Sequence, residues 1–188
     1  MIQIDNLAFS YGSKENGAVF CHMAVMYAFA LYSRGFASEG WRVLEQLYSH
    51  CADFRRSKIL PGIPEYFDER GQGMYPYLTG SGSWLLLTVQ TQLFGVRGQD
   101  GDLVLEPKLL PCHFDASGTA EIHCVSAGHE LTVCYHNPLG LEYGSFRIGT
   151  ASWETGSAEG NGAKLVISRS ELPTNGPLRL DVTLVPCN

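Results

Sequence analysis

The chain has 188 residues, of which 45% are hydrophobic, 11% aromatic and 17% charged, and its formal net charge is −6. This composition belongs to a folded globular protein and excludes a disordered chain. The acidic balance, with no basic cluster longer than Arg55-Arg56, argues against a nucleic-acid partner. The first residues lack the basic and apolar regions of a secretory signal, so none is expected in the given sequence.

The six cysteines are irregularly spaced and form no CxxC pair. Their even number permits disulfides, but their mostly apolar neighbours favour free thiols in a reducing cytosol, so we expect a cytoplasmic protein. Three pairs resemble metal ligands, namely His50-Cys51, Cys112-His113 and His123-Cys124. Adjacent residues on one strand or helix point in different directions, so no metal site is expected from these pairs.

An uncharged run from Ala18 to Ser33 predicts a helix over about 18–34, buried all round and ended by Gly35. The run is short for a membrane span, and none is expected. Polar residues at its entrance, Glu15 and His22 among them, make this a candidate site, because helix N-termini offer unpaired N–H groups. The alternatives are a core histidine with satisfied hydrogen bonds and a solvated glutamate that favours the helix dipole.

A second helix is predicted over about 39–53, capped by Ser38. Its apolar residues recur at steps of three and four, which indicates one buried face and one wet face. They are Trp41, Leu44, Leu47, Tyr48 and Cys51. The short turn between the two predicted helices makes them an αα-hairpin.

Residues 54–78 have no period and contain repeated proline and glycine, which indicates a long loop of the kind that is often functional. The loop combines aromatic residues with acids, a composition that suits sugar rings with their apolar faces and hydroxyl edges. These residues are Tyr66, Phe67, Tyr75, Tyr77, Glu65, Asp68 and Glu69. A loop packed by its own aromatics is the alternative.

The stretch Thr79-Gly80-Ser81-Gly82-Ser83 opens a third predicted helix, which covers about 82–94 and is ended by Gly95. Glycines and hydroxyls at a helix start let a ligand approach the backbone N–H groups, as an anion site requires. A plain flexible helix cap explains the same residues.

After residue 97 short apolar runs alternate with turns, which predicts an antiparallel β-sandwich. The predicted strands are Leu103–Leu105, Thr119–Val125, Leu131–Tyr135, Tyr143–Ile148, Lys164–Ser168 and Leu178–Val185. Helices followed by strands imply an α+β chain of two domains, 1–98 and 99–188.

Three segments, in order over roughly residues 11–112, resemble motifs of inverting glycoside phosphorylases such as cellobiose phosphorylase, and of the related part of cyclic β-1,2-glucan synthases. They are Lys14-Glu15-Asn16-Gly17-Ala18-Val19-Phe20-Cys21-His22, then Tyr77-Leu78-Thr79-Gly80-Ser81-Gly82-Ser83-Trp84, then Gly95-Val96-Arg97 with Gly101-Asp102-Leu103-Val104-Leu105-Glu106-Pro107 and Leu110-Pro111. The sequence departs from the family motif at Ala18, where the family has glycine, and at Cys21, where it has asparagine.

The resemblance implies the end of an (α/α)6 barrel in residues 1–98 and a jelly-roll-like β domain in residues 99–188. In that family an Asp protonates the glycosidic oxygen while inorganic phosphate attacks the anomeric carbon, with inversion. By resemblance His22, Thr79 and Gly80 would bind phosphate, and Glu15 and Glu65 would bind sugar. Phosphate would be a co-substrate, and no cofactor is implied.

No residue of this chain matches the family's general acid, so we expect no catalytic residue here and no activity from the chain alone. The partners implied are an oligosaccharide or sugar 1-phosphate, phosphate, and either the remainder of the barrel or a second copy of the chain. The alternatives are a non-catalytic module that binds carbohydrate or anions, and a purely structural domain.

Overall fold

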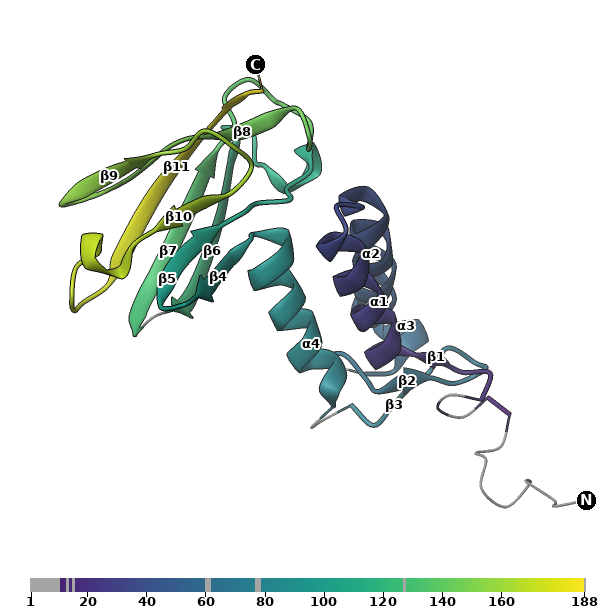
Figure 1. Cartoon of the computed structure of the whole chain (residues 1–188). Helices are drawn as coiled ribbons and strands as arrows, with labels where there is room; N and C mark the ends of the chain where they lie inside the picture. Colours follow the sequence, from purple (N-terminus) through teal and green to yellow (C-terminus); the bar gives the residue numbers. More distant parts are fainter. Residues whose placement is uncertain are drawn as a thin grey trace, which may run out of the picture. The chain divides into compact units, whose positions relative to one another are not determined.

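The structure, a computed structural model, describes residues 11–12, 14, 16–59, 62–76, 79–126 and 128–187. The chain forms two compact units, Met1–Thr88 and Val89–Asn188 (Figure 1). This division precedes the boundary expected near residue 98. The first unit contains α1 (Cys21–Ser33), α2 (Ala37–Ala52), α3 (Phe54–Ser57), α4 (Gly80–Thr88), β1 (Val19–Phe20), β2 (Tyr66–Phe67) and β3 (Gly73–Met74).

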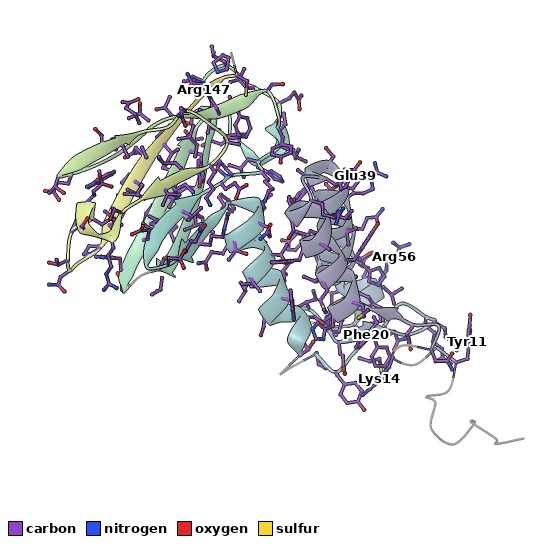
Figure 2. All side chains as sticks on the ribbon, in the orientation of Figure 1. Tyr11, Lys14, Phe20, Glu39, Arg56 and Arg147 are labelled. Carbon is purple, nitrogen blue, oxygen red and sulfur yellow. The ribbon has the colours of Figure 1, made fainter. Side chains whose placement is uncertain are left out.

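Helices α1 and α2 form the predicted αα-hairpin. Gly35 ends α1 with φ +84°, and its N–H donates to the Tyr32 carbonyl while the Phe36 N–H donates to the Leu31 carbonyl. This is a Schellman motif, which satisfies the last carbonyls of the helix. Figure 2 labels Phe20 and Glu39 at opposite ends of the pair, as expected for antiparallel neighbours.

Only one face of α1 is buried, so the prediction of a helix buried all round is wrong. Its fully buried side chains are those of Cys21, Val25, Ala28 and Tyr32. Apolar residues elsewhere on α1, such as Met23 and Tyr27, are more than half exposed, because among the described elements the helix packs mainly against α2 and α4. No helix in the described ranges is both long and apolar enough to cross a membrane.

Helix α2 begins two residues before the predicted start. Phe36 is the N-cap residue, and the predicted cap, Ser38, lies inside the first turn. The helix starts early because the chain turns at Gly35 and the Gly40 N–H already donates to the Phe36 carbonyl. On the predicted apolar face Leu44 and Leu47 are buried, whereas Tyr48 is mostly exposed.

Part of the predicted loop 54–78 forms β2 and β3, which make a small antiparallel sheet with β1, in the order β1-β2-β3. Strand β1 occupies residues that were predicted as the start of the first helix. Phe20 pairs with Tyr66, and Tyr66 pairs with Met74. Tyr66 and Phe67 are buried in the core. Tyr66 lies near Tyr75 of the same loop, as the alternative of a loop packed by its own aromatics expects, whereas Phe67 packs edge-on against His50 of α2.

The third predicted helix was expected to run to Phe94, but α4 ends at Thr88 and Val89–Leu93 form a π-helix, η2. The Thr88 hydroxyl donates to the Trp84 carbonyl at 2.7 Å, which is the acceptor that the Thr88 N–H would use in an α-helix. Such a bond from a threonine side chain competes with the helical ladder and bends helices.

The second unit contains two sheets. One, in the order β10-β5-β4, consists of β4 (Val96–Gln99), β5 (Asp102–Leu105) and β10 (Leu165–Ile167), all antiparallel. The other, in the order β6-β7-β11-β8-β9, consists of β6 (Thr119–Ser126), β7 (His129–His136), β8 (Phe146–Trp153), β9 (Gly156–Glu159) and β11 (Leu178–Pro186). Strands β4 and β9 were not predicted, and β8 begins at Phe146 because Tyr143 and Gly144 form a turn.

One neighbouring pair departs from the expected antiparallel pattern, since β11 runs parallel to β7 and antiparallel to β8. Parallel neighbours need a long crossover, and here β8, β9 and β10 supply it. The last strand therefore enters the sheet between two earlier ones. Whether this architecture is a jelly roll stays a prediction.

The two sheets of the second unit share a core, and Figure 1 shows one lying over the other. On β11 the residues Leu178, Leu180, Val182 and Leu184 are buried, while alternate positions are polar. The fully buried Tyr135 of β7 reaches across, and its hydroxyl donates to the Phe94 carbonyl just before β4 at 2.7 Å. These features fit the predicted sandwich, in which one face of each sheet is dry.

Gly40 is required where α2 crosses α1, because a Cβ at this position would lie 2.6 Å from the Tyr32 ring. We expect Gly40→Ala to lower the free energy of unfolding by about 1–3 kcal/mol through overpacking. Gly82 of α4 is the matched control, since its Cβ would meet only ordinary contacts at 3.6 Å. Gly82→Ala should raise stability by about 0.5–1 kcal/mol. Denaturant unfolding of both variants tests this, and equal effects would contradict it.

His113 should make the second unit less stable in acid. Its Nδ1 accepts from the Leu110 N–H at 2.8 Å, and burial lowers the pKa of His113 from 6.5 to about 4. Between these values the unfolded chain binds a proton that the folded chain does not, so stability falls as the pH drops from about 6.5 to 4. Denaturant unfolding across this range should show a shallower loss for His113→Asn. A ring titration of His113 with a midpoint near 6.5 would contradict the prediction.

Candidate functional site

The start of α1 is held by the small sheet of the first unit. The Cys21 N–H donates to the Glu65 carbonyl at 2.8 Å, directly after the β1–β2 pairing of Phe20 with Tyr66. The Glu65 N–H in turn contacts the carbonyls of Met74 and Tyr75. Glu65, a predicted sugar-binding residue, is therefore bonded through its backbone to Cys21, the residue directly before His22. The Glu65 side chain is half-buried.

The His22 ring lies directly against Gly80, the first residue of α4. A Cβ on Gly80 would be 2.6 Å from the His22 Cε1 and 3.0 Å from each ring nitrogen. Trp84, one turn further along α4, lies 6.3 Å from the His22 ring and packs edge-on against Phe29 of α1. The structure thus brings together His22 and Gly80, which are 58 positions apart.

The Nε2 atom of His22 is buried and has no hydrogen-bond partner among the residues that the structure describes. A buried polar atom without a partner costs about 1–3 kcal/mol, so such atoms mark places where a ligand or water is held. The described contacts of His22 therefore do not make it a satisfied core histidine.

Thr79 caps α4. Its Oγ1 accepts from the Ser81 N–H at 3.0 Å, and its hydroxyl donates to Ser81 Oγ at 2.8 Å. Ser81 is fully buried, and both its N–H and its hydroxyl oxygen are bonded to Thr79. A ligand could accept a hydrogen bond from the Thr79 hydroxyl only after that hydroxyl rotates away from Ser81. Both predicted alternatives for this stretch, a helix cap and an anion site, therefore share the same residue.

Several other residues that were predicted to contact sugar either lie outside the described residues or have side chains already used within the loop. Glu15 lies outside the described residues, as does Tyr77. Its neighbour Lys14 is described, and the Lys14 ammonium lies 5.2 Å from the centre of the Tyr75 ring. Tyr75 is exposed, whereas Asp68 accepts from the Arg70 and Gln72 N–H groups and so caps a turn. Of the loop aromatics suggested for sugar, Tyr75 is the described one with an open ring.

The groups that meet at this helix start are of kinds that bind small oxyanions in proteins. The first turn of this nine-residue helix carries backbone N–H groups and partial positive charge, and the His22 ring lies against its first residue, Gly80. No metal is needed for such binding.

Comparison with known proteins gives one informative match. The chain is 25% identical to a 3-O-β-D-glucopyranosyl-β-D-glucuronide phosphorylase from Paenibacillus borealis, over an alignment that covers 73% of this chain. The chain spans 18% of the length of that relative. No family model matches the chain. The match supports a relationship to glycoside phosphorylases.

The capping role of Thr79 can be tested separately from ligand binding. We expect Thr79→Ala to lower the free energy of unfolding by about 1 kcal/mol, because the Ser81 N–H loses its acceptor in a buried place. Thr79→Ser keeps the hydroxyl and should retain most of the stability. Denaturant unfolding followed by far-UV circular dichroism measures both, and an alanine variant as stable as the serine variant would refute the cap.

Proposed function

We propose that this chain is the C-terminal part of a glycoside phosphorylase and carries its phosphate- and sugar-binding residues. The observation that carries the proposal is the buried Nε2 of His22, which has no hydrogen-bond partner among the described residues and lies beside the N-terminus of α4. The two resembling motifs that contribute these residues are far apart in sequence and meet at one place. The similarity to a glucosyl-glucuronide phosphorylase supports the same class of enzyme.

In this proposal inorganic phosphate is the co-substrate and binds between His22, the Gly80 N–H and the Thr79 hydroxyl. Neutral donors at a positive helix end stabilise the dianion without requiring a metal or another cofactor. Phosphate would then attack the anomeric carbon of a β-glucoside and give a sugar 1-phosphate with inverted configuration. The proton for the leaving oxygen would come from an acid outside this chain.

Sugar binding is assigned to Glu15 and Glu65. Glu65 is next to the start of α1 through its backbone, and its N–H also contacts the carbonyl of Tyr75, whose ring is exposed. A carboxylate beside an aromatic ring suits the hydroxyl edge and the apolar face of a pyranose. The sugar ring would therefore lie on the side of the phosphate site formed by the β1-β2-β3 sheet.

The exposed apolar face of the first unit is assigned to the remainder of an (α/α)6 barrel, or to a second copy of the chain. Met23 and Tyr27 on α1 and Leu86 on α4 are more than half exposed. Exposed apolar side chains gathered on neighbouring helices mark interaction surfaces. The second unit would be the jelly-roll-like domain that follows the barrel, and the whole protein would be cytoplasmic.

Phosphate titration followed by NMR tests the proposed site. We expect the Gly80 amide and the His22 ring to shift together with millimolar dissociation, roughly −4 kcal/mol, because the site has few donors. A sugar 1-phosphate should move the same two signals. His22→Ala should abolish saturation, while His50→Gln, on α2, should leave it unchanged.

Other outcomes favour the alternatives. Shifts confined to the second unit, or none that saturate below about 100 mM, would make Thr79 a plain cap and the first unit a structural domain. If phosphate binds saturably but no sugar 1-phosphate moves the same two signals, a non-catalytic anion-binding module would be favoured.

A further inference from the structure

Three strands of the five-stranded sheet bring potential metal ligands together on its polar face. Glu121 of β6 pairs with Cys134 of β7, and Cys134 pairs with Asp181 of β11. Cross-strand partners point to the same side of a sheet. His136 is two residues beyond Cys134 on β7 and therefore lies on that side too. The four side chains form one patch across adjacent strands.

The ligand atoms of Cys134, His136 and Asp181 all lie within 4.8 Å of one another. His136 Nε2 is 3.0 Å from Asp181 Oδ1. A tetrahedral ion with bonds of about 2.0–2.3 Å separates its ligand atoms by about 3.3–3.6 Å. Side-chain shifts of about 1 Å would therefore complete three corners of a tetrahedron.

Burial and access suit such a site. Cys134 is 2% exposed, so its sulfur lies at the back of the patch, while the His136 and Asp181 side chains are 37% and 42% exposed. Asp181 also lines an open hollow of about 400 Å³ with Thr132, Ser152 and Arg179. An ion could thus enter from solvent and keep a water molecule at its fourth position.

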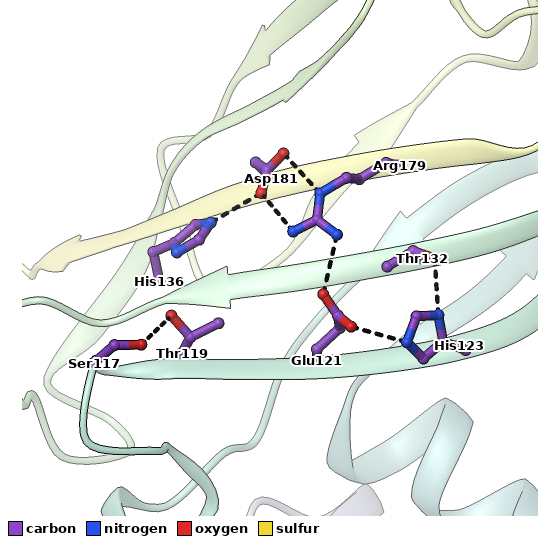
Figure 3. Close-up of polar contacts among 8 residues, drawn as sticks. All are labelled: Ser117, Thr119, Glu121, His123, Thr132, His136, Arg179 and Asp181. Atoms are coloured by element: carbon purple, nitrogen blue, oxygen red, sulfur yellow. Dashed lines mark hydrogen bonds and ion pairs between the residues drawn. The ribbon is translucent and has the colours of Figure 1, made fainter.

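The surrounding charges also match a divalent cation. Arg179 bridges Glu121 at 3.0 Å and both Asp181 oxygens at 3.3 Å (Figure 3). With Cys134 as thiolate, three negative groups and one positive group leave a net charge of −2, which a divalent ion balances. The Arg179 pairs are exposed and individually weak, so they orient Asp181 without excluding an ion.

We propose that Cys134, His136 and Asp181 bind a divalent transition-metal ion, with zinc the best match. A thiolate, an imidazole and a carboxylate form a mixed set that zinc accepts and that magnesium or calcium does not. On binding, the Cys134 thiol, which now donates to Glu121, releases its proton to solvent. This inference is independent of the proposed phosphate site, which lies in the other unit.

Cobalt(II) titration of the full chain tests the proposal, since cobalt substitutes for zinc and reports its ligands. We expect one equivalent to give intense visible bands of tetrahedral geometry and a sulfur-to-cobalt charge-transfer band, both removed by added zinc. Cys134→Ala should abolish the charge-transfer band and weaken zinc binding at least roughly tenfold. His136→Gln should keep that band but weaken binding similarly.

Cys124→Ala is the matched control, because Cys124 lies on β6 opposite the buried Leu131 and so faces the other side of the sheet. It should bind cobalt as the unsubstituted chain does. No charge-transfer band at one equivalent, or unchanged zinc affinity in Cys134→Ala, would overturn the proposal. If Cys134→Ala does not fold, His136→Gln decides, since unchanged affinity in that half-exposed variant would overturn it equally.

Discussion

The close contact between the His22 ring and Gly80 is the constraint on which the arrangement of the first unit depends. The ring occupies the space of a side chain at position 80, so any residue other than glycine would push α4 away from the start of α1. Trp84 packs on the next turn, and the bond from Cys21 to Glu65 fixes the backbone on the other side. Three segments distant in sequence meet there because one of them has no side chain at the meeting point.

Features with a local cause could be predicted from the sequence. Gly35 ends α1, as predicted, because a residue tolerant of positive φ fits a Schellman motif. Helix α4 begins at Gly80, directly after its capping threonine and two residues before the predicted start. The strand β11 was evident from its strict alternation. In each case the residues that produce the feature lie within a few positions of it.

Features that depend on neighbours could not be predicted in the same way. The uncharged run of α1 indicates an apolar environment but does not show which faces of the helix are buried. In the structure the fully buried face is the one that carries Cys21, Val25, Ala28 and Tyr32. Tyr66 and Phe67 are aromatic residues of the kind that stack on sugar rings, but their side chains are buried in the core. The termination of α4 at Thr88 depends on one side-chain hydrogen bond that no periodicity encodes.

The patch around Cys134 was missed for a related reason. The histidine–cysteine pairs that stand out in the sequence are adjacent, whereas two ligands on the same side of a strand are two positions apart, as Cys134 and His136 are. Asp181 joins them only because β11 enters the sheet parallel to β7, a pairing that short hairpins cannot produce. A search for i, i+2 ligand pairs would have found two of the three residues, but the third required the topology.

The buried nitrogen of His22 also limits which ligands can satisfy it. If Nε2 carries the ring proton it needs an acceptor, and if Nδ1 carries it Nε2 needs a donor. The nearby first turn of α4 contributes N–H donors, which themselves need an acceptor. One oxyanion satisfies the helix N–H groups and an Nε2–H together, whereas a ligand that only donates would satisfy the other tautomer and leave the helix end unpaired. In the proposed phosphate site, the Nε2–H tautomer and an anion would therefore form a matched pair.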